Sequence, residues 1–124
     1  MWNFAGNSRG INAANIMSLH HTNPGIGNAP VANTELTDLP YERQICAFAA
    51  PVADGPAAMS DLTDDVVFPL HLSINQNAQF VGLWDGATYL GYIVPNSPFN
   101  FTGTATTRTF KVLADETTLV RTNP

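Results

Sequence analysis

The chain has 124 residues and a formal net charge of −5 at pH 7, and only 12% of its residues are charged, against a usual share of roughly 25%. This length is enough for one domain with a real core and too short for two. The single lysine and four arginines form no basic cluster, which argues against nucleic acid and anionic membranes as partners. No apolar run reaches the roughly 18 residues of a transmembrane helix. A surface so poor in charge favours burial against copies of the same chain or a larger assembly.

Residues 1–15 show neither helical nor strand periodicity and are rich in Asn, Gly and Ala. We therefore expect an extended N-terminal arm at 1–15, followed by a single β-sandwich domain at 16–124. In a disordered tail the large aromatic side chains of Trp2 and Phe4 would stay unburied, so we regard them as candidate anchors of the arm on a neighbouring surface. A segment that folds back onto its own domain is an equal alternative.

The next segments alternate between expected strands and long connections. We expect a first strand at 16–22, with Ser18 and His20 on one face, and a turn at 23–25. A polar connection from 26 to 40 follows, too rich in Gly, Pro and Asn for a helix. A loop this long is usually functional or bound to a partner, so its apolar residues are candidate partner contacts: Ile26, Val31 and Leu36.

The strongest local signal lies at 80–94, where Asp85-Gly86 separates two apolar segments and predicts a tight β-hairpin. Both faces of this hairpin carry apolar bulk, so we expect cover on both sides, within a sandwich or at a subunit contact. Further strands are expected at 41–49, around 57–59, at 65–74 with Pro69 marking an edge or bulge, and at 99–102, 106–113 and 117–121.

All these apolar segments are short, β-branched or aromatic, and bounded by turn residues, and no window shows a period of 3.6. The pattern predicts an all-β fold: an antiparallel, jelly-roll-like β-sandwich of about seven or eight strands.

Residues capable of chemistry are present but not in catalytic or metal-binding spacing. His20 and His21 are adjacent and face opposite ways in a strand, and His71 has no ligand spacing to either. No serine lies in a G-x-S-x-G motif or beside a plausible histidine partner. Cys46, in an apolar setting, is expected to be a buried core residue. We therefore expect no catalytic residue, no metal and no cofactor, and no enzyme.

Aromatic side chains are concentrated late in the chain, and Trp84, Tyr89 and Tyr92 form a candidate platform for a glycan. The favoured interpretation is that they belong to the sandwich core, with Trp84 and Tyr89 pairing across the hairpin.

Four segments in order carry a resemblance to a known family. They are Leu19-His20-His21-Thr22-Asn23-Pro24-Gly25, Glu35-Leu36 with Tyr41-Glu42-Arg43-Gln44, Val66-Val67-Phe68-Pro69, and Val81-Gly82-Leu83-Trp84-Asp85 with Leu90-Gly91-Tyr92. In this order the chain resembles small virion proteins of tailed bacteriophages, often labelled tail fibre proteins. The amphipathic helix with which that family usually begins has no counterpart in residues 1–15.

The resemblance implies a structural protein located in the virion and assembled in the host cytoplasm. We expect a capsid decoration or cement protein, or a small head- or tail-associated module. Its expected partners are the major capsid protein or tail proteins and copies of itself, with a trimer favoured by the low charge and the two-sided hairpin. The alternative is a carbohydrate-binding or host-surface adhesin module of a tail fibre.

Overall fold

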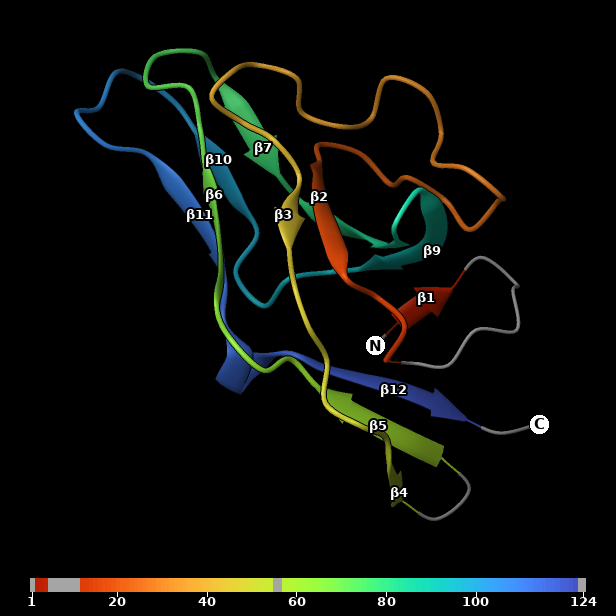
Figure 1. Cartoon of the computed structure of the whole chain (residues 1–124). Coiled ribbons are helices and arrows are strands. Elements are labelled where there is room, and N and C mark those ends of the chain that lie inside the picture. Colours follow the sequence, from red (N-terminus) through yellow and green to blue (C-terminus); the bar gives the residue numbers. More distant parts are fainter. Residues whose placement is uncertain (1, 5–11, 55–56, 123–124) are drawn as a thin grey trace.

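The computed structural model describes residues 2–4, 12–54 and 57–122 and shows an all-β chain built from several antiparallel sheets (Figure 1). The strands are β1 (Trp2–Phe4), β2 (Ile16–His20), β3 (Gln44–Ile45), β4 (Val52–Asp54), β5 (Ala57–Asp61), β6 (Val66–Pro69), β7 (Gln76–Ala78), β8 (Phe80–Asp85), β9 (Thr88–Ile93), β10 (Phe99–Phe101), β11 (Thr109–Val112) and β12 (Thr118–Thr122). A short 3-10 helix, η1 (Ala114–Glu116), joins β11 to β12. The predicted all-β class is confirmed.

The largest sheet has five strands in the order β1-β9-β8-β2-β3. Its centre is the predicted hairpin of β8 and β9, in which Asp85 pairs with Thr88 across a two-residue turn of Gly86 and Ala87. Gly86 has a φ of 59°, a value that glycine adopts without strain. A bulge between Leu83 and Trp84 shifts the register of the hairpin.

The N-terminal strand β1 lies along β9 of its own chain, with Trp2 opposite Ile93 and Phe4 opposite Gly91. The backbone of these three residues therefore folds back onto its own domain, which is the second of the two alternatives considered for the N-terminal segment. Residues 1 and 5–11 of the expected arm, and the side chains of Trp2 and Phe4, lie outside what the structure describes.

Three smaller antiparallel sheets complete the fold: β12-β5-β4, β11-β6 and β10-β7. Figure 1 shows β4, β5 and β12 at the lower end of the molecule, and β6 and β11 rise from there along one side towards β7 and β10. A single hydrophobic cluster gathers buried side chains from all four sheets, among them Met17, Phe68, Ala78, Leu83, Phe110 and Leu119.

The segment 41–49 differs from its prediction as one strand. Only Gln44 and Ile45 pair with β2, and the chain then leaves this sheet. Phe48 forms an isolated bridge with Leu62, and Ala49 N donates to the Asp61 carbonyl next to β5. The segment is divided because it crosses from one sheet to another. With β1, β4 and β7, for which no strand was expected, the described residues form twelve strands instead of the expected seven or eight.

The centre of the five-stranded sheet, which contains the hairpin of β8 and β9, is covered on both faces, as the hairpin pattern predicted. One face, with Met17, Leu19, Val81 and Leu83, belongs to the main core. The opposite face is covered by the chain's own connection between β2 and β3. Tyr89 on this face donates its hydroxyl to the Gly25 carbonyl of that connection over 2.7 Å.

Candidate functional site

A continuous chain of hydrogen bonds lies under the connection between β2 and β3, and we call it the His20 hydrogen-bond chain. Trp84 Nε1 donates to Ser18 Oγ over 2.9 Å, and Ser18 Oγ lies 2.7 Å from His20 Nε2. On the other side of the ring, His20 Nδ1 lies 2.9 Å from Thr34 Oγ1, and Thr34 Oγ1 donates to the Val31 carbonyl over 2.8 Å.

The two ends of this chain fix its direction. An indole N–H can only donate and a carbonyl oxygen can only accept. Because the Thr34 proton goes to the Val31 carbonyl, Thr34 Oγ1 must accept from His20 Nδ1–H. His20 Nε2 then accepts the Ser18 hydroxyl proton, so the neutral Nδ1–H tautomer of His20 satisfies every partner.

Strand alternation and one glycine make this arrangement possible. Ser18 and His20 lie two residues apart in β2 and so share a face, and Gly82 stands directly opposite Ser18 in β8. A Cβ at Gly82 would overlap Ser18 Oγ and would lie 2.8 Å from His20 Nε2. The absence of a side chain at Gly82 is therefore a steric requirement of the His20 hydrogen-bond chain.

The expectation that no serine lies beside a histidine is wrong, because Ser18 and His20 are hydrogen-bonded through i, i+2 alternation. A serine hydroxyl against a histidine nitrogen is also the pairing that activates a nucleophile. Here both side chains are fully buried, so no substrate reaches them in this conformation. Burial, the largest effect, lowers the pKa of His20 to about 4, which keeps the ring neutral. The arrangement is suited to holding the connection on the sheet.

A second set of polar contacts, centred on Glu35, anchors the same connection. Arg43 binds both carboxylate oxygens of Glu35, over 3.0 and 2.9 Å, and its guanidinium lies 3.9 Å from the centre of the Trp84 ring. Tyr41 donates its hydroxyl to Glu35 over 2.6 Å and accepts from Leu19 N over 3.0 Å. Burial acts to raise the pKa of Glu35, but the hydrogen bonds from Arg43 and Tyr41 outweigh it and lower that pKa.

The aromatic residues of the candidate glycan platform do not form an exposed surface. Trp84 and Tyr89 are buried and pack edge to face, with ring centres 5.2 Å apart. Arg43 covers the Trp84 ring, and Tyr92, half-buried, packs edge to face against Phe80. The predicted pairing of Trp84 with Tyr89 across the hairpin is confirmed. A glycan platform needs ring faces open to solvent, and the burial of Trp84 and Tyr89 removes two of the three expected.

The candidate partner contacts of the long connection divide into two kinds. Ile26 and Val31 are exposed, whereas Leu36 is buried in the main core. The segment between Ile26 and Val31 is closed by a hydrogen bond from Val31 N to the Pro24 carbonyl. Leu39 in the same connection is 76% exposed. The exposed apolar surface of the connection therefore includes a residue that the sequence analysis did not name.

The remaining candidates for chemistry are separate from one another. His21 is exposed, and His71 Nδ1 accepts from Ser73 N and Ile74 N in a local turn. Among the described residues no group of three or more His, Cys, Asp or Glu side chains could hold a metal ion. Cys46 is buried as expected, and burial raises the pKa of its thiol to about 12.

No protein-family model, curated protein sequence or solved structure matches this chain. Within the part of the chain that the structure describes, no helix has the length and apolar character needed to span a membrane.

Proposed function

We propose that this chain is a structural protein of a bacteriophage virion that works through protein–protein contacts. In this proposal it is a capsid decoration or cement protein, or a small head- or tail-associated module. Its partners are copies of itself, with a trimer favoured, and the major capsid protein or tail proteins. The ordered resemblance of residues 19–25, 35–44, 66–69 and 81–92 to small phage virion proteins supports this assignment, as does the charged fraction of 12%.

The observation that carries the proposal is the position of the exposed aliphatic side chains. Ile45 is 85% exposed on β3, and Val52 is 69% exposed on β4. Each of these strands ends the order of its sheet. An exposed apolar edge strand is a template for pairing with another chain, and free monomers usually protect such edges with charge, especially lysine. With Ile26, Val31 and Leu39 on the connection, these residues supply apolar contact surface at several places.

We further propose that the sheets are arranged as a jelly-roll-like sandwich. The single core that joins side chains of all four sheets supports this arrangement, since a sandwich buries the inner faces of two sheets against each other.

Sedimentation velocity over a wide concentration range tests the self-association. We expect the wild-type chain to form a discrete oligomer, and we expect Ile45→Lys and Val52→Lys to shift it towards monomer. Thr106→Lys is the matched control, because it adds the same charge at an exposed polar position outside the strands. Circular dichroism of each variant separates loss of assembly from loss of fold.

Cryo-electron microscopy of the particle that carries this protein tests the virion role. Density for the chain at capsid symmetry axes would support decoration, and density at the tail would support the tail-associated form. A chain that stays monomeric at high concentration and is absent from purified particles would refute the proposal.

A further inference from the structure

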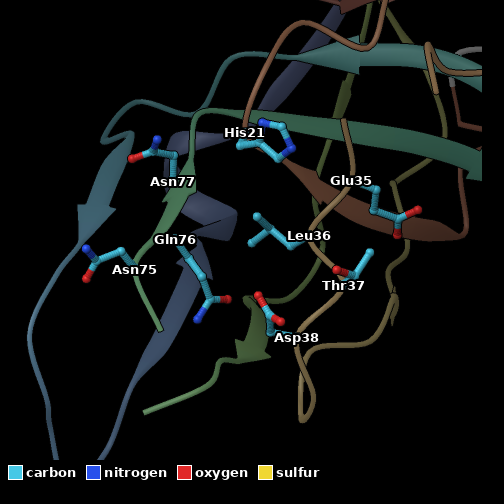
Figure 2. A pocket seen from close by; sticks show the side chains of 8 residues that line it. All are labelled: His21, Glu35, Leu36, Thr37, Asp38, Asn75, Gln76 and Asn77. Atoms are coloured by element: carbon cyan, nitrogen blue, oxygen red, sulfur yellow. The ribbon is translucent and has the colours of Figure 1, made fainter. Parts of the chain in front are cut away.

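An open cleft of about 300 Å³ lies between the connection that follows β2 and the start of β7 (Figure 2). Its lining is mostly polar and comes from two short segments and one histidine: Glu35, Leu36, Thr37 and Asp38, then Asn75, Gln76 and Asn77, and His21. Figure 2 shows the Gln76 side chain reaching towards Asp38, with Leu36 beside them.

Gln76 presents an acceptor that has no donor within the described part of the chain. The residue is only 5% exposed, and its Oε1 is buried and finds no hydrogen-bond partner among the described residues. The orientation of the amide is fixed, because Nε2 donates to the carbonyls of His71 and Ile74 over 3.2 and 3.1 Å. Exchanging the two amide atoms would set the oxygen against two carbonyl oxygens. Arg108 also donates to the Ile74 carbonyl, over 2.6 Å, which holds this turn in place.

Asp38 supplies a second acceptor on the facing segment. Its backbone carbonyl accepts from Tyr41 N, but among the described residues its carboxylate has no hydrogen bond or ion pair. Glu35, the other carboxylate of the lining, is fully occupied by Arg43 and Tyr41, and Figure 2 shows it pointing away from Asp38 and Gln76. As far as the described residues show, the cleft therefore offers one uncompensated negative charge beside one neutral oxygen that lacks a proton donor.

This pair of acceptors defines the chemistry of an occupant. An anion would meet the Asp38 carboxylate without a compensating cation, because Arg43 is already bound to Glu35. A calcium ion needs six to eight oxygen ligands, and the described residues place no group of three ionisable ligands together. A cationic group with several N–H donors can satisfy both the carboxylate and the amide oxygen through charge-assisted hydrogen bonds.

We propose that the cleft between Asp38 and Gln76 binds an alkylammonium or guanidinium group, with its N–H donors directed at the Asp38 carboxylate and at Gln76 Oε1. A free polyamine and the side chain of a lysine or arginine from another protein present the same group. This inference does not rest on the virion role, since it follows from two acceptors within one chain.

Titration of isotope-labelled protein with n-butylammonium chloride, followed by NMR, tests the proposal. We expect saturable shifts of the Gln76 side-chain amide and of the Leu36 and Asp38 backbone amides. Half-saturation is expected on the order of 1 mM, as for two charge-assisted hydrogen bonds. Asp38→Asn should weaken binding about tenfold. Asp115→Asn, an equivalent change at an exposed position outside the cleft, should leave it unchanged.

Two control ions make the result decisive. Tetramethylammonium carries the same charge but has no N–H, so it should produce no saturable shift of the Gln76 amide. The proposal would be overturned if n-butylammonium and tetramethylammonium produced equal shifts, or if Asp38→Asn bound n-butylammonium as tightly as the wild type. It would also be overturned if calcium saturated the cleft at a lower concentration than n-butylammonium. If Gln76 Oε1 is served by a buried water alone, n-butylammonium will give no saturable shift and the proposal is wrong. Comparing putrescine with Nα-acetyl-lysine amide then distinguishes a free diamine from a protein side chain.

Discussion

Acidification below about pH 6.5 should destabilise this protein, because His20 is buried in its neutral form and burial disfavours the charged ring. In the His20 hydrogen-bond chain, Nδ1–H already donates to Thr34 and Nε2 accepts from Ser18. A second ring proton would face the Ser18 hydroxyl, which also receives the Trp84 N–H. Protonation of His20 therefore reverses the hydrogen bond with Ser18, leaves the Ser18 hydroxyl proton without its acceptor, and places a charge in a buried site.

The size of the effect follows from the pKa values. The pKa of His20 in the folded chain is about 4, against an ordinary 6.5, with burial as the largest cause. The unfolded chain takes up this proton first, so stability is complete above pH 6.5 and falls as the pH drops towards 4. The full loss is about 3 kcal/mol, of which about 2 kcal/mol is already present at pH 5.

The carboxylate of Glu35 affects stability only at lower pH. The pKa of Glu35 is lowered from its ordinary 4.5, so the stability contributed by that group is present above this value and is lost below it. The window between about pH 6.5 and pH 5 therefore isolates His20.

Urea unfolding followed by circular dichroism, at about pH 7.5 and pH 5, measures the difference. We expect the wild type to lose about 2 kcal/mol of unfolding free energy between these conditions, and His21→Gln, at the exposed neighbour, to lose the same amount. His20→Gln removes the titrating ring, so its stability should be lower but nearly independent of pH in this window.

If His20→Gln does not fold, the titration of His20 can be measured directly in the wild-type protein. The His20 ring signals of the wild type, followed by NMR, should not titrate between pH 7.5 and about pH 5. A His20 ring that becomes protonated near pH 6.5 in the folded protein would refute the reasoning. So would a wild-type stability that is flat down to pH 5.

Three further outcomes test individual contacts. Gly82→Ala should lower the free energy of unfolding by about 2–4 kcal/mol, because the new methyl group displaces the Ser18 hydroxyl; unchanged stability in urea would contradict the close packing at Gly82. Tyr41→Phe should cost about 1–3 kcal/mol, because the buried Leu19 N–H loses its acceptor, whereas Tyr92→Phe, which removes only an exposed hydrogen bond from Asn23, should cost less than about 0.5 kcal/mol. Cys46 should react with a disulfide reagent at pH 8 only after unfolding, because burial raises its thiol pKa to about 12; rapid labelling of the folded protein would show that the thiol is accessible.

The elements that could be predicted from the sequence are those determined by neighbouring residues. The hairpin of β8 and β9 follows from Asp85-Gly86 between two apolar segments, and both faces of it are covered as the apolar pattern indicates. The strands β2, β10 and β11 lie within their predicted ranges, and β12 ends one residue beyond its range, because each is a short apolar run between turn residues.

What could not be predicted depends on partners that are distant in sequence. The division of 41–49 is decided by which strands lie alongside it, and β7 (Gln76–Ala78) carries no apolar pattern at all. In the candidate site, the sequence predicted that Ser18 and His20 lie on one face of a strand. Their partners Thr34 and Trp84 lie 14 residues from His20 and 66 residues from Ser18, and no local pattern connects them.

The distribution of positive charge links the two proposals made for this chain. Only five residues are basic, and two arginines are engaged within the fold. Arg43 binds Glu35 and covers Trp84, and the buried Arg108 donates to three backbone carbonyls. The single lysine, Lys111, lies in β11. The edge strands β3 and β4 therefore contain no lysine to discourage pairing with another chain, and the Asp38 carboxylate has no cation from the described residues. The two proposals assign these features to groups from outside the chain: an apolar partner at the edges and a cationic donor in the cleft.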